Sequence, residues 1–209
     1  ERHDRLYVAK DIERNGQAQI NFTPYAAAAH FEQKGSFLPS FALSCVIVAE
    51  LYKNRSNADV KKVLDQYKDH GGGHGYHAQN TIINYDTQEV IHYPSAADFN
   101  QTAAVNTAFQ RKINRFDKAA LQDSLLETAL QDAAHARYVK QLTGLANPAI
   151  LVDIGKYFGK KAKLWFPWNG KAGATCTSKK ACWFGCSSNY LNLYADDNLN
   201  GISASRGVR

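Results

Sequence analysis

The sequence predicts an α+β protein, and three observations lead to that class. Residues 78–93 contain two short runs suited to strands, separated by the polar triplet Asp86-Thr87-Gln88, as in a β-hairpin. Residues 100–159 carry apolar residues at helical spacing between helix start and stop signals. Three of the four cysteines lie between Cys176 and Cys186. We therefore expect a small antiparallel sheet built around the hairpin, a helical block at 100–159, and a disulfide-tied C-terminal lobe.

Length and composition favour one globular domain. The chain has 209 residues, which is enough to bury a sizeable core. We expect a mixed α/β part at 1–99 that carries the candidate site, the helical block at 100–159, and a lobe at 160–209 rich in Lys, Trp and Cys. No apolar run approaches the roughly 18 residues that a membrane helix needs, so no membrane span is expected.

The cysteines and the missing methionines favour a secreted protein. The sequence has no methionine, even at position 1, which indicates removal of a signal peptide or pro-segment, or trimming. Four cysteines then predict at least one disulfide in an oxidising compartment, the alternative being a cytosolic protein with four thiols. Cys176 paired with Cys182 or Cys186 closes a short loop and leaves Cys45 unpaired.

Local signals place most of the helices. The apolar run at 41–52 is too long for a strand and predicts a buried helix. Ser56 or Asn57 caps a short amphipathic helix that ends before a glycine loop at 71–75. Within the helical block we expect one helix at 100–116 and a second from the cap Asp117 to the stop at Gly144. A third begins at Asn147-Pro148 and ends at Gly159.

The first candidate site is a cysteine nucleophile. Cys45 lies near the start of the buried helix and His77 begins a strand about 30 residues later, while His92 or Asn80 can orient the His77 ring. A thiolate needs a helix N-terminus and an adjacent imidazole, which later protonates the leaving amine. This order resembles papain-like hydrolases of the cell-wall peptidase type over about residues 41–95. The resemblance implies Cys45 as nucleophile and His77 as base, whereas the alternative is that Cys45 is a buried small hydrophobe.

Two metal sites are alternatives. His70, His74 and His77 are three histidines that a glycine loop can bring around zinc, leaving an open catalytic position, or they form an exposed and weakly binding loop. Oxygen-bearing side chains alternate toward the C-terminus as in the first half of a calcium loop, at Asp196, Asn198 and Asn200. The competing interpretation of that stretch is a turn rich in Asx residues.

The third candidate is a basic aromatic segment. No acidic residue lies between Asp153 and Asp196, and all three tryptophans of the chain are in that interval. The predicted binding residues are Trp165, Trp168, Lys160, Lys161 and Lys163. Such a segment suits an anionic or sugar-rich partner, or it is a solvated basic face over a tryptophan-filled core.

These observations lead to three hypotheses. The first is a secreted cysteine hydrolase or transferase, which performs acyl transfer on amide bonds of extracellular protein or cell-wall peptide and requires no cofactor. The second is a non-enzymatic binding protein or toxin that holds a cell-surface polysaccharide or another anionic polymer; nucleic acid is a less favoured partner. The third is a metal-dependent hydrolase built on the zinc loop.

Overall fold

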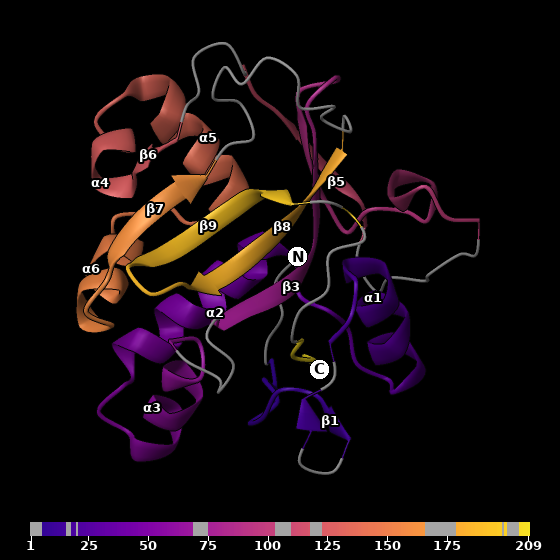
Figure 1. Ribbon diagram of the computed structural model, residues 1–209, viewed down its shortest axis with the longest axis horizontal. Helices are drawn as coiled ribbons and strands as arrows, with labels where there is room; N and C mark the ends of the chain where they lie inside the picture. The colour runs from indigo at the N-terminus through magenta and orange to yellow at the C-terminus, as the bar shows by residue number, and fades with distance from the viewer. Residues whose placement is uncertain are drawn as a thin grey trace.

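The computed structural model describes residues 6–15, 18–19, 21–68, 75–102, 110–117, 123–165, 179–197, 199 and 205–209. Within these ranges the chain forms six α-helices and a strongly twisted seven-stranded sheet (Figure 1), so the predicted mixture of helices and sheet is confirmed. The helices are α1 (Pro24–Gln33), α2 (Phe41–Lys53), α3 (Ala58–Asp65), α4 (Leu126–Ala129), α5 (Ala133–Thr143) and α6 (Ile150–Tyr157), with a 3₁₀ turn η1 (Ala97–Phe99). The strands are β1 (Arg14–Asn15), β2 (Ala18–Gln19), β3 (Gly75–Asn84), β4 (Glu89–His92), β5 (Lys112–Arg115), β6 (Ser124–Leu125), β7 (Lys161–Trp165), β8 (Lys179–Cys186) and β9 (Tyr190–Asp197).

The sheet has the strand order β5-β4-β3-β8-β9-β7-β6, and β1 and β2 form a separate pair. All neighbours in the large sheet are antiparallel except β7 and β9, which run parallel. The predicted hairpin is present as β3–β4, with Ile83 opposite Val90. The sheet is nevertheless larger than predicted, because β8 pairs with β3 of the hairpin at the centre of the sheet and β9 pairs with β8.

Apolar side chains alternate between the two faces of the sheet, as strand geometry requires. The face covered by α2, α5 and α6 holds the main core, which includes Val90 and Phe184. The opposite face carries smaller clusters, one of them formed by Ile82, Ile91 and Phe99. Tyr25 of α1 and Phe99 of η1 pack on that opposite face, so both faces of the central strands are covered.

A bulge in β3 anchors the start of α2. The register against β8 shifts between Ala78 and Ile82, and the intervening side chains of Gln79, Asn80 and Thr81 are buried. The backbone N–H of Phe41, the first residue of α2, donates to Thr81 Oγ1 over 2.9 Å. The bulge thus supplies polar partners to a helix end that would otherwise bury unsatisfied N–H groups.

The helical block predicted for 100–159 is wrong in part. Strand β5 occupies the end of the helix expected at 100–116, where Ile113 pairs with Ile91 of β4. The alternation around Ile113 is a strand pattern, and pairing with a buried neighbour decides the conformation. The second expected helix is divided at Asp132, whose carboxylate accepts from the His135 N–H over 2.9 Å and caps α5. Strand β6 also lies in this block.

The disulfide-tied C-terminal lobe is wrong as well. No disulfide is seen among the cysteines that the structure describes, which are Cys45, Cys182 and Cys186; Cys176 lies outside the described residues. Cys182 and Cys186 lie four residues apart on β8, so their Cα atoms are about 13 Å apart. A disulfide needs a separation below about 7 Å. Secretion stays a prediction, now without the disulfide that supported it.

The C-terminal residues 205–209 lie against the N-terminal segment. The N–H of Tyr7 donates to the carbonyl of Arg209 over 2.7 Å, and Val208 bridges to both Val8 and Phe37. None of the helices in the described ranges has the length and apolar character needed to cross a membrane.

Candidate functional site

Cys45 lies in the hydrophobic core. It is the fifth residue of α2 and is 0% exposed. Burial, with a smaller contribution from nearby Cys182, raises the pKa of the Cys45 thiol well above its ordinary value. The thiol is therefore protonated at neutral pH and out of contact with solvent. The acyl-transfer hypothesis remains a prediction, and the position of Cys45 gives it no support.

This position gives a direct expectation for thiol chemistry. Cys45 in the native protein should stay unmodified under a large excess of iodoacetamide and should react readily in urea, because only unfolding exposes the thiol and restores an ordinary pKa. Mass mapping of the peptide that contains Cys45 makes the comparison, with the Cys45→Ala variant identifying the signal. Rapid alkylation of native Cys45 would contradict this placement and revive the nucleophile hypothesis.

His77, the predicted base, is also buried. It lies on β3, is 2% exposed, and its ring stacks on Tyr67 with 4.4 Å between centroids. Burial raises the pKa of the Tyr67 hydroxyl; nearby Arg206 opposes that shift and Cys45 adds to it. The structure therefore brings Cys45 and His77 to the same neighbour, Tyr67, whose ring packs against the imidazole.

His92 and Asn80, predicted to orient His77, have other surroundings. Thr81 Oγ1 lies 2.9 Å from His92 Nδ1, and His92 Nε2 lies 3.1 Å from the carbonyl oxygen of Gln141. A carbonyl only accepts, so Nε2 carries the proton and the Thr81 hydroxyl donates to Nδ1. Asn80 is buried in the bulge, and its Oδ1 has no hydrogen-bond partner within the described part of the chain.

The His92 contacts form a structural chain of hydrogen bonds. It runs from the Phe41 N–H at the start of α2, through Thr81 and His92, to Gln141 in the last turn of α5. Burial lowers the pKa of His92 from 6.5 to about 4, with a smaller effect in the same direction from Lys112, while the bond to Gln141 opposes both. His92 is therefore neutral at pH 7. Its hydrogen bonds fix the start of α2 relative to the last turn of α5.

The metal-binding prediction is corrected. Among the residues that the structure describes, no group of three or more His, Cys, Asp and Glu side chains is placed to hold a metal ion. His70 and His74 lie outside the described residues, and the third member, His77, is buried beneath Tyr67. Of the calcium residues, Asp196 falls within strand β9, and Asn198 and Asn200 lie outside the described residues.

The basic aromatic segment uses two of its lysines internally. The Lys160 ammonium donates to the backbone carbonyls of Ser187 and Ser188. The Lys163 ammonium lies 3.3 Å from the centroid of the Trp165 ring, as in a cation–π contact. Because these two ammonium groups have partners within the protein, fewer positive charges can bind an anionic polymer than the sequence suggests.

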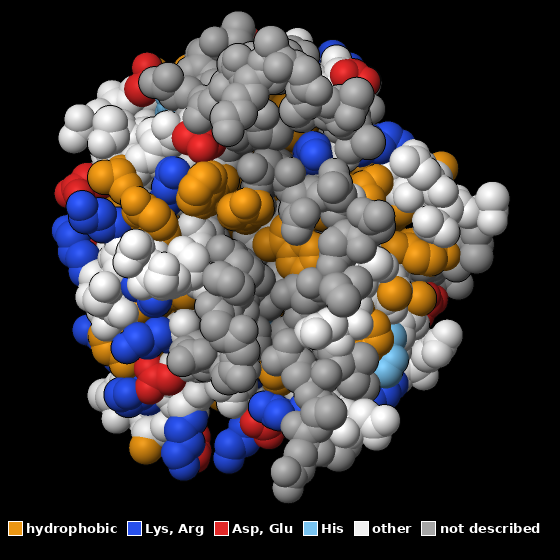
Figure 2. All heavy atoms as spheres, in the orientation of Figure 1, with side chains coloured by type: hydrophobic (Ala, Val, Ile, Leu, Met, Phe, Trp, Pro, Cys, Tyr) orange, Lys and Arg blue, Asp and Glu red, His pale blue; other side chains and the backbone are white. Residues whose placement is uncertain are grey.

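The remaining residues of that segment are placed unequally. Trp165 is half-buried against Tyr194, and Lys161 is exposed. Figure 2 shows apolar side chains beside Lys and Arg side chains over β7 and β9. Trp168 lies outside the described residues, and Trp183 belongs to the interior at 3% exposed. A docking face here stays a prediction.

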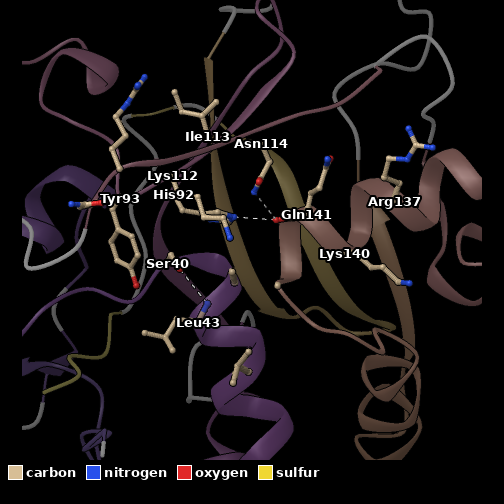
Figure 3. A pocket seen from close by; sticks show the side chains of 15 residues that line it. Ser40, Leu43, His92, Tyr93, Lys112, Ile113, Asn114, Arg137, Lys140 and Gln141 are labelled. Atoms are coloured by element: carbon tan, nitrogen blue, oxygen red, sulfur yellow. Dashed lines mark hydrogen bonds between the residues drawn. The ribbon is translucent and has the colours of Figure 1, made fainter. Parts of the chain in front are cut away.

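A pocket of about 810 Å³ between α2, α5 and the β4–β5 pair was not predicted (Figure 3). We call it the α2–α5 pocket, and its volume falls in the range of roughly 300–1,000 Å³ common for ligand sites. Its lining residues are Ser40, Ala42, Leu43, Val46, His92, Tyr93, Gln110, Arg111, Lys112, Ile113, Asn114, Arg137, Lys140, Gln141 and Gly144. None of them is acidic, and four carry a positive charge.

Three of these cations have no acidic partner in the part of the chain that the structure describes. Arg111 forms a two-point ion pair with Asp98, with nitrogen–oxygen distances of 2.8 and 2.9 Å. In contrast, no carboxylate of the described residues lies within 4.0 Å of Lys112, Arg137 or Lys140, which are all exposed. Several other exposed lysines are paired: Lys53, Lys61 and Lys62 of α2 and α3 each lie within 4.0 Å of an acidic side chain.

The two helix ends at the pocket increase its preference for anions. The cap residue Ser40 and the first-turn residues Ala42 and Leu43 of α2 line it, and a helix N-terminus carries partial positive charge. The opposite, partially negative end of α5 is screened, because the Gln141 carbonyl accepts from His92 and from Asn114 Nδ2. The local field in the pocket is therefore positive at neutral pH.

The side chains of Arg137 and Lys140 extend from α5 at the rim of the pocket (Figure 3). They are three residues apart and so share one face of the helix. Their flexible stems allow the charged groups to reach a bound ligand. The spacing of Arg137 and Lys140 on one helix face can be seen in the sequence. The third cation of the pocket, Lys112, lies on β5, in a stretch that was expected to be helical, so the sequence did not indicate that the three cations line one pocket.

Comparisons with known proteins give no further guide. No protein-family model, no curated protein and no solved structure matches this chain.

Proposed function

We propose that this chain is a binding protein that holds an anionic ligand in the α2–α5 pocket. The observation that carries the proposal is a set of three cations that have no acidic partner among the described residues, Lys112, Arg137 and Lys140. They come from two elements and line one pocket that has no acidic lining residue. Single-sign charge around a concave site raises the local concentration of ligands of opposite charge.

The polar groups of the pocket support binding more than catalysis. Ser40 Oγ accepts from the Leu43 N–H over 3.2 Å and acts as the cap of α2. His92 uses both ring nitrogens in the hydrogen-bond chain, and its pKa near 4 keeps it neutral. A nucleophile–base pair in hydrogen-bond contact, the usual sign of covalent catalysis, is not found among the described lining residues.

Charge reversal in the pocket should strongly weaken anion binding. The double variant Arg137→Glu with Lys140→Glu is expected to weaken binding of a trivalent probe, citrate, by about tenfold or more, because like charges then face the ligand. Binding to the native protein should also weaken as sodium chloride rises, since exposed charges are screened. Isothermal titration calorimetry measures both effects.

Lys68→Glu provides the matched control, because Lys68 is exposed, lies in the turn that follows α3, and does not line the pocket. Reversal there should change citrate affinity by less than about twofold. Citrate binding that is equal in the double variant and the native protein would exclude the α2–α5 pocket as the anion site.

A further inference from the structure

Within the described residues, the outer edge of strand β5 has no pairing partner. β5 is the terminal strand of the sheet, and no described strand pairs with its other side. The Phe116 N–H donates to the Gln88 carbonyl over 2.9 Å, so this residue pair is a hydrogen-bonded one. The pattern alternates, and Lys112 and Asn114 therefore direct their backbone groups toward β4, while those of Ile113 and Arg115 point outward.

These outward groups are available for pairing. Within the described residues, no backbone hydrogen bond involves the outward N–H and C=O groups of Ile113 and Arg115. The strand itself is exposed, with Ile113 40% exposed and the Arg115 side chain 83% exposed. An open strand edge is a template for an added strand.

The two faces of the edge differ in character. Asn114 Nδ2 reaches the Gln141 carbonyl, and Lys112 lies opposite His92, so both side chains are on the α5 side with the pocket. Ile113 lies opposite Ile91, whose side chain packs with Phe99 on the other face. A strand added here would place alternate side chains beside the cations of the pocket and beside Ile113.

The charge on this edge selects the partner. A pairing of two β5 edges would bring Lys112 and Arg115 of both copies close together on one short pair of strands, and like charges across strands are destabilising. A second copy of this chain is therefore disfavoured, and an acidic segment is favoured. We infer that the β5 edge and the α2–α5 pocket together bind an extended acidic peptide of a partner protein by strand addition.

This inference rests on the proposed anion site and specifies its ligand. The main chain of the peptide pairs with Ile113 and Arg115, which gives affinity, while its side chains give specificity. Acidic residues at every second position lie on the side of Lys112, Arg137 and Lys140. The residues between them lie beside Ile113 and should be aliphatic.

Backbone methylation tests strand addition separately from charge. The probe is a blocked hexapeptide of alternating Glu and Val, and two derivatives are N-methylated either at all Glu or at all Val residues. One derivative should bind like the parent, because its methyl groups face away from β5. The other should lose about tenfold or more, because its edge-facing N–H groups are blocked. Equal affinity, or equal loss, of the two derivatives would overturn the inference.

A variant of the protein gives the reciprocal test. Arg115→Pro removes one outward N–H and no hydrogen bond to β4, whereas Arg115→Ala loses the same charge and keeps the N–H; Arg115 is not a lining residue of the α2–α5 pocket. Arg115→Pro should weaken the Glu/Val peptide by about tenfold relative to Arg115→Ala, and both variants should leave citrate affinity unchanged. Peptide binding by a folded Arg115→Pro protein that equals that of Arg115→Ala would contradict strand addition. If this variant does not fold, the methylated peptides decide the question.

The results also separate the two proposals. Citrate binding that depends on Arg137 and Lys140, together with equal loss for the two methylated peptides, would retain the anion pocket and reject strand addition. Citrate binding that is insensitive to charge reversal, together with unequal affinities of the two methylated peptides, would reject the pocket as the anion site. Only strand addition at the β5 edge would then be retained.

Discussion

Replacing Thr81 with valine is expected to lower the free energy of unfolding by about 2–6 kcal/mol. The Thr81 hydroxyl accepts from the Phe41 N–H and donates to His92 Nδ1, and the side chain is 0% exposed. Valine keeps the volume but leaves a buried donor and a buried acceptor without partners, each of which costs about 1–3 kcal/mol. Denaturant unfolding followed by circular dichroism measures the change.

Thr81→Ser is the matched control, because serine retains the hydroxyl and loses one methyl group. It should recover most of the stability lost in Thr81→Val. Two variants of equal stability would mean that the hydroxyl contributes nothing, and that the start of α2 is held by packing alone.

Acidification from pH 7 to pH 4 is expected to remove about 3 kcal/mol of stability through His92 alone. Burial holds the pKa of folded His92 at about 4, below its ordinary value of 6.5. The unfolded chain therefore binds the proton more tightly, and folding stability falls as the pH drops below 6.5 and levels off below about 4. Urea unfolding at half-unit pH intervals shows this slope.

His92→Gln identifies the source of that slope. Glutamine does not titrate, so the loss of stability between pH 6.5 and pH 4.5 should become smaller by about 1 kcal/mol per pH unit on average. The carboxyl pKa values of Glu13 and Asp98 are lowered from their ordinary values of 4.5 and 3.8. These two groups therefore change the folding stability only at a more acidic pH than His92 does. An identical pH profile for His92→Gln and the native protein would show that His92 does not control the acid response.

Local signals were sufficient for the hairpin and for several helices. The β3–β4 hairpin follows from two runs of strand-forming residues around a polar turn, and Asn57 caps α3 as expected, accepting from the Asp59 and Val60 N–H groups. The apolar run that predicted a buried helix forms α2. In each case the residues that decide the structure are neighbours in sequence.

The remainder of the sheet depends on contacts between distant segments. Strand β8 is buried over nearly its whole length because β3 and β9 flank it. The sequence does not predict this burial, since the strand begins with two charged residues, Lys179 and Lys180. The candidate site could not be predicted for the same reason. Its three unpartnered cations come from β5 and α5, and β5 becomes a strand only by pairing with β4.

The same distant pairing determines the order in which the protein can fold. The centre of the sheet joins β3 to β8, with Gly75 opposite Cys186, although the two strands are far apart in the chain. Pairing between distant segments is slow because a long loop must close first. On the ribosome, the β3–β4 hairpin therefore emerges long before its central partner, with the apolar side chains of Ile82 and Ile83 not yet covered. The nascent chain should depend on chaperones until β8 and β9 have been synthesised, and heat or crowding during translation should cause more aggregation than the same stress on the finished protein.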